Sequence, residues 1–318
     1  MLEDSFLSLV PIVFVAAHGQ RHCSLAWLGD AIQKGMKTIR GKRAVVTGAA
    51  TGIGRAITLE LARQGAELLL IDIDAEQLEQ TADDARAAGA VVTAARCDLS
   101  DMGQLEQVID ELRRRWGSVD ILINNAGILY YGATEAMSGQ QWDRLLAINL
   151  LAPIRLIREL LPAMLEKPEA HILNVCSMYG LFARRRSAAY NTSKYALVGL
   201  SESLRAEYNA QGLGVTALCP GFVRTDLFSA GQTDHPGGVC RQPPSWLCTS
   251  PERVAKIAIK AIRRNRGLVL VTPLARMLWY VKRAAPSLMT YLGNALRRRG
   301  DSTAEPQADD QPQRRTAA

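Results

Sequence analysis

The chain has 318 residues, and 48% of them are hydrophobic, which is enough for one large α/β domain with a sizeable core. Its six cysteines show no paired framework and its four histidines are scattered, so the sequence predicts a reducing, cytoplasmic setting and no metal. The net charge of +7 arises near the C-terminus, where residues 251–300 hold twelve Lys and Arg and a single acid, Glu252. The basic isoelectric point therefore gives no argument for nucleic-acid binding.

An apolar run near the N-terminus, Phe6 to Ala17, is too short to span a bilayer, which needs roughly 20 apolar residues. Acidic rather than basic residues precede it, so it also makes a poor signal peptide. We expect residues 1–40 to form an N-terminal extension. Residues 1–35 are then either an accessory segment or sequence upstream of a start at Met36.

From Gly41 onward, apolar runs alternate with helical patterns. The runs predict strands at 43–47, 67–72, 91–98, 120–127, 171–177, 214–221 and 267–273. Helical patterns lie at 55–65, 75–88 and 102–117, before about Met164, at 188–211, and from 251 onward, where Ser250 can cap. Strands that are apolar throughout indicate a parallel sheet covered on both faces. The sequence predicts a single doubly wound, Rossmann-type α/β domain over 41–273, with ligands beyond the carboxyl ends of its strands.

The first strand is followed by a glycine-rich stretch, "VVTGAATGIGRAI" (45–57), in which Gly48, Gly52 and Gly54 precede a helix. Glycine allows tight turns and close approach of the backbone to another group. At the start of a helix such an approach exposes free N–H groups to an anion. This stretch indicates a pyrophosphate site, and an ordinary glycine-rich turn is the alternative.

Two acids end the next strands. Asp72 follows the glycines by about twenty residues, where a carboxylate can bind both hydroxyls of an adenosine ribose and repel a 2′-phosphate. Asp98 could bind the adenine edge. For both residues the alternative is a helix N-cap.

A second group of residues is suited to proton transfer. Tyr190 and Lys194 are four residues apart in a predicted helix, so they share one face, where a cation is expected to lower the pKa of the phenol. Alone, such a pair could be an exposed helix surface. Ser177 ends the fifth predicted strand at the same edge of the sheet, and Asn149 lies within a helix, where asparagine is unfavourable.

Together these features resemble the short-chain dehydrogenase/reductase family over Gly41 to Pro273. The matches are Thr47, Gly48, Gly52 and Gly54, the segment Asn124 to Gly127, Asn149, Ser177, the Tyr190–Lys194 pair and Pro220 to Thr225. The resemblance implies that Tyr190 is the acid/base, that Lys194 holds the nicotinamide ribose, that Ser177 orients the carbonyl and that Asn149 fixes a relay water. It also implies a cofactor site formed by Thr47, Gly48, Gly52, Ile53, Gly54, Asp72, Asp98, Asn125, Tyr190, Lys194, Val223 and Thr225.

The resemblance further implies hydride transfer between a nicotinamide and an alcohol or ketone. Relatives that prefer NADP often carry a basic residue where this chain has Thr51 or Ile73, so NAD is expected and NADP is less favoured. Cys176 replaces a serine of many relatives, which we expect to be harmless. The alternative, a dinucleotide-binding sensor or scaffold without turnover, is disfavoured because the implied catalytic residues are all present.

We expect substrate choice to lie in 226–249, which contains Leu227, Phe228, Trp246 and Leu247 and suits a bulky apolar alcohol or ketone. Residues 274–299 carry a basic amphipathic helical pattern in two halves separated by Pro286. This segment either packs on the core or a partner subunit, or lies on a membrane surface. We also expect a homo-dimer or homo-tetramer, no nucleic-acid partner, and a disordered tail over 300–318.

Overall fold

The computed structural model describes residues 35–234 and 243–287. The apolar run at 6–17, the second half of the 274–299 pattern and the tail over 300–318 lie outside these residues. Within them, none of the helices has the length and apolar character needed to cross a membrane.

The main sheet of the described residues has seven parallel strands in the order β3-β2-β1-β4-β6-β7-β9. Val45, for example, is paired with Leu69 on one side and Leu122 on the other. The order reverses between β1 and β4, so the predicted doubly wound fold is confirmed. The strand bounds are β1 Arg43–Thr47, β2 Glu67–Asp72, β3 Val92–Arg96, β4 Ile121–Asn124, β6 Ala170–Val175, β7 Leu213–Cys219 and β9 Leu268–Leu270. A small parallel pair joins β5 (Tyr130–Tyr131) to β8 (Gln232–Thr233).

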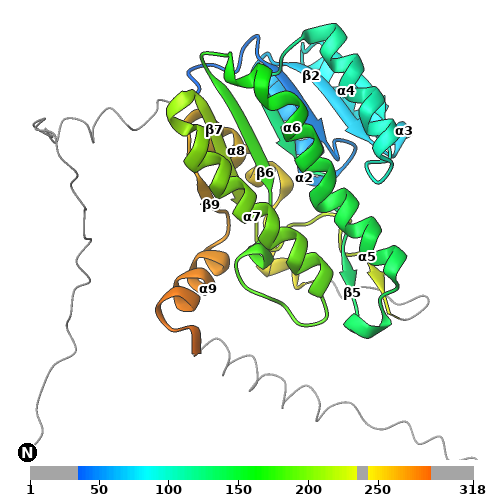
Figure 1. Cartoon of the computed structure of the whole chain (residues 1–318), viewed down its shortest axis with the longest axis vertical. Helices are drawn as coiled ribbons and strands as arrows, with labels where there is room; N and C mark the ends of the chain where they lie inside the picture. The colour runs from blue at the N-terminus through cyan, green and yellow to red at the C-terminus, as the bar shows by residue number, and fades with distance from the viewer. Residues whose placement is uncertain (1–34, 235–242, 288–318) are drawn as a thin grey trace, which may run out of the picture. The chain divides into compact units, whose positions relative to one another are not determined.

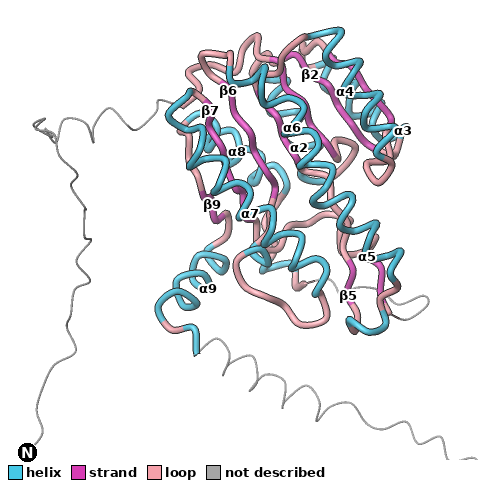
Figure 2. The backbone as a smooth tube through the Cα atoms, viewed as in Figure 1, coloured by secondary structure: helices cyan, strands magenta, loops and turns pink. Residues whose placement is uncertain are grey.

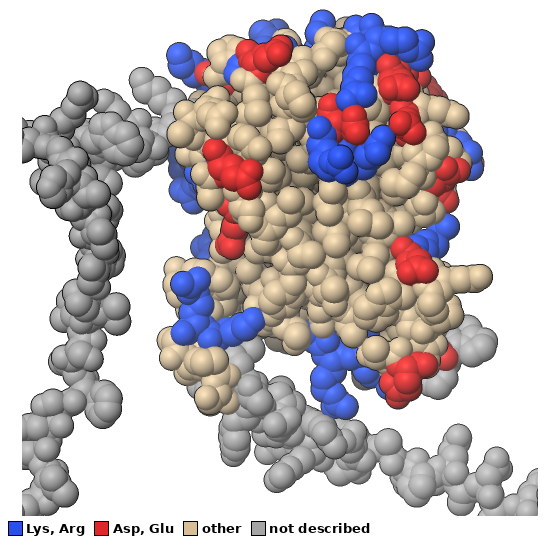
Figure 3. Space-filling view, in the orientation of Figure 1, with Lys and Arg blue, Asp and Glu red and all other residues tan. Residues whose placement is uncertain are grey.

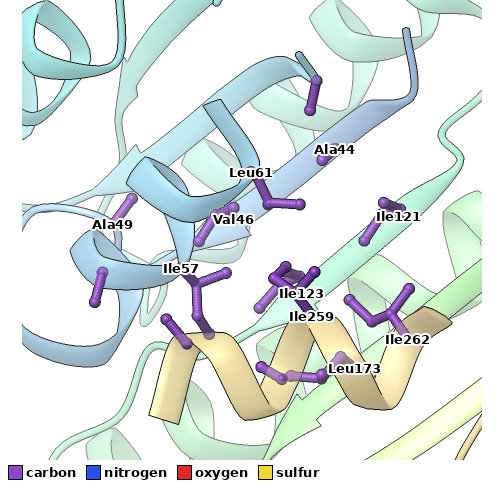
Figure 4. Close-up of a cluster of buried hydrophobic side chains, with 14 of the residues drawn as sticks. Ala44, Val46, Ala49, Ile57, Leu61, Ile121, Ile123, Leu173, Ile259 and Ile262 are labelled. Atoms are coloured by element: carbon purple, nitrogen blue, oxygen red, sulfur yellow. The ribbon is translucent and has the colours of Figure 1, made fainter. Parts of the chain in front are cut away.

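Helices cover both faces of the sheet (Figure 1). One face packs against α2 (Gly52–Arg63), α3 (Ala75–Ala87) and α8 (Pro251–Arg263). The other packs against α4 (Met102–Trp116), α6 (Ala152–Leu165) and α7 (Ala188–Tyr208). Figure 4 shows the first interface, where Ile57 and Leu61 of α2 and Ile259 of α8 meet Val46 and Ile123 of the sheet. Met36 and Ile39, which precede the expected domain boundary at residue 41, are buried in this cluster.

The helix starts show which acids are caps. Asp74 caps α3 by accepting from the backbone of Gln77, and Asp101 caps α4. Ser250 caps α8, with Pro251 in the first turn, as the sequence predicts. Asp72 and Asp98 therefore are not the caps of these helices, and their carboxylates lie at the ends of strands.

The long helical pattern before Met164 is divided in the structure. Helix α5 (Gly139–Leu146) passes through a π-helical turn, η2 (Ala147–Leu151), into α6, and Asn149 lies within that turn. Such π-bulges locally change the helical hydrogen-bonding pattern and frequently occur at functional sites. The unfavourable position of Asn149 in the sequence is thus matched by an irregular turn of the backbone.

The last described helix, α9 (Pro273–Ala284), follows β9 and contacts it. Ala275 is fully buried and Leu278 is half-buried, both in the cluster that contains Tyr179 and Tyr190. Lys282 donates hydrogen bonds to the Leu181 carbonyl (2.5 Å) and to the Tyr195 hydroxyl (2.7 Å). Met277 and Tyr280 are exposed, so α9 packs on the domain through one side only.

Candidate active site

A cleft of about 500 Å³ runs along the carboxyl ends of the strands. In Figure 2 the loops that follow β6 and the loops around β5 gather below the sheet, at this edge. Five strands end earlier than the sequence predicts: those expected at 91–98, 120–127, 171–177, 214–221 and 267–273 end at Arg96, Asn124, Val175, Cys219 and Leu270. Asp98, Asn125 and Ser177 follow the strand ends and line the cleft.

The glycine turn needs glycine at each of its three positions. Gly48 has φ +64°, and a Cβ added there would lie 2.8 Å from the Ala126 Cα atom. Gly52 has φ +55°, and an added Cβ would lie 3.0 Å from the Thr225 side chain. At Gly54 a Cβ would overlap the Gly48 carbonyl oxygen, so this glycine lets α2 start directly against the turn. The cradle is thus shaped for close approach of a ligand to the backbone.

Two residues that the sequence assigns to cofactor contact have another place. Neither Thr47 nor Gly54 lines the cleft. The Thr47 hydroxyl is buried and accepts hydrogen bonds from the backbone of Asn125 (3.0 Å) and Ala126 (3.1 Å). The Asn125 amide in turn donates to the Gly48 carbonyl (2.9 Å). Thr47 and Gly54 therefore shape the turn from beneath, while Gly48, Gly52, Ile53 and Asn125 line the cleft.

Acidic side chains gather at the end of the cleft next to β2 and β3. Asp72 accepts from the backbone of Ala50 (2.9 Å) and Asp74 (3.2 Å), which fixes its carboxylate beside the glycine turn. Asp98 forms an ion pair with Arg144 of α5 (3.3 Å). Burial opposes ionisation of Asp98, but hydrogen bonds from Ser100 and the Arg144 charge hold its pKa below the usual range. Arg144 lines the same cleft and was not found from the sequence, because no local pattern links it to Asp98.

Ser177, Tyr190 and Lys194 meet at the other end of the cleft. Ser177 begins a short helix, η3 (Met178–Gly180), and its hydroxyl accepts from the Tyr179 backbone (3.1 Å). Tyr190 and Lys194 lie on α7, and the Lys194 ammonium is 5.8 Å from the centre of the Tyr190 ring. Lys194 donates to the Val175 carbonyl at the end of β6 (2.9 Å). Because both α7 side chains are buried, they form part of the cleft wall and not an exposed helix surface.

The electrostatics of this pair differ from the expectation. The sequence predicts that Lys194 lowers the pKa of Tyr190, but burial raises that pKa to about 12. A hydrogen bond with Ser177 acts in the opposite direction and is the weaker effect. Burial also lowers the pKa of Lys194. Desolvation disfavours the charged form of each group, and it dominates because both side chains are enclosed.

Asn149 binds the backbone opposite α7. Its side chain accepts from the Ile128 backbone (2.8 Å), and donates to the Ile128 carbonyl (2.9 Å) and to Ser193 (3.2 Å). A Cβ added to Gly127 would lie 3.3 Å from Asn149 Oδ1 and 3.4 Å from Lys194 Nζ, so both groups face this glycine. Asn149 thus ties the chain after β4 to α7 beside the lysine.

The substrate-facing wall comes partly from the expected segment. Leu227 and Phe228 of the segment 226–249 line the cleft, and so do Val223 and Thr225, the predicted cofactor contacts just before it. Trp246 is 80% exposed, and neither it nor Leu247 lines the cleft, so the prediction that they contact substrate is not supported. Residues 235–242 of that segment lie outside the described residues. Further lining residues that the sequence analysis did not single out follow the strand ends: Leu129, Met178, Tyr179, and Phe222 within the matched segment Pro220 to Thr225.

The described residues include no group of His, Cys, Asp and Glu side chains arranged to hold a metal ion. The cradle and the acidic end instead fit a dinucleotide: backbone and glycines for a pyrophosphate, and Asp72 for a ribose. A doubly wound sheet with a cleft at the carboxyl ends of its strands is the class of fold that dinucleotide-binding proteins use. The family model described as short chain dehydrogenase matches residues 42–235, and the chain belongs to this family of oxidoreductases.

Known relatives agree with this assignment. The chain is 32% identical over 243 residues to a mouse protein named 17-beta-hydroxysteroid dehydrogenase 13, covering 76% of this chain and 77% of that one. It is also similar to a short chain dehydrogenase/reductase from Burkholderia phymatum solved in complex with NAD, with 31% identity, a TM-score of 0.70, and coverage of 80% and 97%. A metagenomic short-chain oxidoreductase solved with NADP is 30% identical, with a TM-score of 0.61 and coverage of 73% and 98%.

Proposed function

We propose that this protein is an NAD-dependent dehydrogenase/reductase that acts on a bulky apolar alcohol or ketone. One observation carries the proposal: Ser177, Tyr190 and Lys194 meet at one end of a cleft whose other end holds Asp72. The proposed catalytic domain is 41–273, with Asn149 as the fourth catalytic residue.

The proposed chemistry divides between cofactor and protein. The nicotinamide, when bound, accepts or supplies the hydride. Tyr190 gives its phenol proton to the oxygen of a ketone during reduction, or takes the proton of an alcohol during oxidation. Ser177, which lines the cleft with Tyr190, can donate its hydroxyl proton to the same substrate oxygen and orient it. Lys194, held by the Val175 carbonyl, places a cation beside Tyr190 and the proposed ribose. The fixed positions of these groups favour a productive geometry.

Cofactor preference is proposed from the acidic end of the cleft. Asp72 accepts from the turn backbone and would meet a 2′-phosphate as a like charge. Ile73 follows it, and Arg144 is paired with Asp98. Both features favour NAD over NADP. Val223 and Thr225 line the cleft beyond Ser177 and are proposed contacts of the nicotinamide amide.

The proposed substrate class rests on the apolar wall. Leu129, Met178, Phe222, Leu227 and Phe228 line the reactive end of the cleft. A pocket of this kind gains binding energy mainly by removing apolar surface from water. The name of the mouse relative, a hydroxysteroid dehydrogenase, supports a bulky alcohol or ketone as the class.

A homo-dimer or homo-tetramer is also proposed, in the cytoplasm. Figure 3 shows that the face formed by α6 and α7 has few charged side chains in its centre and more around its rim. Leu151, which directly precedes α6, is 49% exposed. Tyr195 and Gly199 of α7 are exposed as well. Self-association through this face would bury that surface. Helix α9 leaves Met277 and Tyr280 exposed, and these residues are proposed either for a partner subunit or for a membrane surface.

The function is tested by measuring oxidation and reduction of hydrophobic alcohols and ketones with NAD and NADP. Tyr190→Phe should lose at least about 100-fold in kcat, because general acid–base catalysis contributes about that much or more. It should still bind NADH with nearly unchanged Kd. Tyr208→Phe, at the far end of the same helix, is the matched control and should retain activity. Binding of NADH without turnover by the wild type would favour the sensor or scaffold alternative.

A further inference from the structure

A loop of three arginines, Arg184 to Arg186, connects η3 to α7 beside the reactive end of the cleft. Its backbone is held at several points. The Asn191 side chain donates to the Arg184 carbonyl (2.7 Å), and the Gly132 backbone donates to the Arg186 carbonyl (2.8 Å). Arg186 has φ 58°, in the left-handed region that few non-glycine residues adopt. These contacts fix the loop against the chain around β5.

The three arginines differ in their partners. Arg186 forms an ion pair with Asp234, whose carboxylate also accepts from the Ala133 backbone (3.0 Å). Arg186 is thus neutralised and holds the loop. None of the ion pairs found among the described residues includes Arg184. Arg184 is half-buried, so it is a positioned cation without a carboxylate partner in this part of the chain.

Aromatic side chains hold the Arg184 guanidinium. It lies 4.4 Å from the centre of the Tyr131 ring and 5.6 Å from the centre of the Tyr179 ring. A planar guanidinium stacked in this way keeps N–H groups available and suits bidentate recognition of a carboxylate.

Tyr179 connects this cation to the cleft. It lies two residues after Ser177, lines the cleft, and packs edge-to-face against Phe222 (6.3 Å between ring centres). Arg184 itself does not line the cleft; it lines a separate surface hollow together with Asn191 and Tyr195. Because Tyr179 lines the cleft and also contacts Arg184, a substrate that has its oxygen at Tyr190 and extends past Tyr179 would approach Arg184 with its far end.

We infer that Arg184 determines substrate specificity by binding a carboxylate at the end of the substrate remote from the reacting carbon. This inference rests on the proposed function and narrows it: the substrate is an apolar alcohol or ketone that is also a carboxylic acid. The apolar wall binds its body, and Arg184 selects its charged end. Specificity then comes from a charged group that a neutral analogue cannot replace.

The test compares acids with their neutral esters. The substrates are para-acetylbenzoate and a mid-chain keto-stearate, each beside its methyl ester, with NADH as hydride donor. One of the two acids should be long enough to place its carboxylate at Arg184 while its ketone is at Tyr190. For that acid, kcat/KM should exceed that of its ester by about tenfold or more, as expected for a charge-assisted hydrogen bond. Arg184→Met should remove this preference by lowering kcat/KM for the acid, mainly through KM, with little effect on the ester. Arg184→Lys should restore only part of it.

The control is Arg114→Met, which removes one positive charge from an exposed position near the end of α4. That end of α4 lies at the amino ends of the strands, away from the cleft, because Trp116 at the end of α4 donates to Glu67 at the start of β2. This variant should keep the acid preference, which excludes an effect of net charge. Equal kcat/KM for acid and ester, or an equal loss for both in Arg184→Met, overturns the inference.

Failure of the proposed function gives a different result. In that case the wild type reduces none of the four compounds and none of the hydrophobic alcohol and ketone panel, whether or not it binds NADH. If the protein binds NADH without turning over this panel, Kd values for the acids and esters are measured on the NADH complex. Tighter binding of an acid that is lost in Arg184→Met supports the inference, and equal Kd values overturn it.

Discussion

The protonation state of Tyr190 decides whether the proposed proton transfer is efficient, and burial shifts the pKa of this phenol upward. Burial raises its pKa to about 12, above the ordinary value of about 10. At about pH 8 the phenolate is then about one molecule in ten thousand, against about one in a hundred for an unperturbed phenol. The neutral phenol is the form that donates a proton to a ketone. Reduction should therefore change little with pH below about pH 10, and oxidation, which needs the phenolate, should rise about tenfold per pH unit.

The pKa can be measured directly by NMR on protein with isotope-labelled tyrosine, with Tyr190→Phe used to assign the signal. In the protein alone, the Tyr190 signal should not titrate below about pH 10.5. Because the pKa of Tyr190 is higher in the folded protein than in the unfolded chain, this residue contributes folding stability that is complete below about pH 10. That contribution is lost as pH rises toward 12. A midpoint below about 10 would refute the argument from burial. Lys194→Met should leave this midpoint within about one unit, since Lys194 is not among the main groups that shift it.

Three further predictions concern other parts of the molecule. Asp72→Ser combined with Ile73→Arg should shift the ratio of Kd values from NADH toward NADPH, and a wild type that binds NADPH more tightly contradicts the assignment of Asp72. His171 is buried and its pKa is lowered to about 3, so stability should fall by about 2 kcal/mol from about pH 7 to about pH 5 as the unfolded state takes up a proton. Urea unfolding should show this loss in the wild type and not in His171→Asn; parallel pH profiles would refute it. Truncation after Pro273 removes Ala275 from the cluster around Tyr190, so size-exclusion chromatography should show aggregation or altered assembly, whereas truncation after Ser287 should not. Binding of the full chain to anionic vesicles that weakens with salt would favour the membrane alternative for α9, and a soluble, fully active short form without lipid binding by the parent would contradict both alternatives.

Much of the fold could be predicted because its signals are local. Apolar runs of strand length, helical spacing and the three glycines after β1 depend on residues that are neighbours in the chain. The same holds for Tyr190 and Lys194, which a helix places on one face whatever surrounds it. The family could be identified from these spacings, and the family model and the parallel sheet confirm that identification.

The burial and the partners of individual side chains could not be predicted, because they depend on segments that are far apart in the sequence. Thr47 and Gly54 belong to the motif, yet the turn places them beneath the cleft, where Thr47 binds the backbone after β4. A lysine four residues from a tyrosine suggests a lowered pKa, but enclosure of Tyr190 reverses the direction. Desolvation depends on everything packed around a group, and spacing does not record it.

The sequence by itself determined the order of strands and helices, the glycine turn, and the residue types available at the carboxyl ends of the strands. Only the tertiary structure decided which of these side chains face the cleft, and it added partners that no motif links, such as Arg144 for Asp98. It also placed Tyr131 of β5 together with Tyr179 and Arg184, which lie between β6 and α7. The physical reason is that periodicity and spacing act along the chain, whereas burial, ion pairing and stacking depend on which segments meet in space.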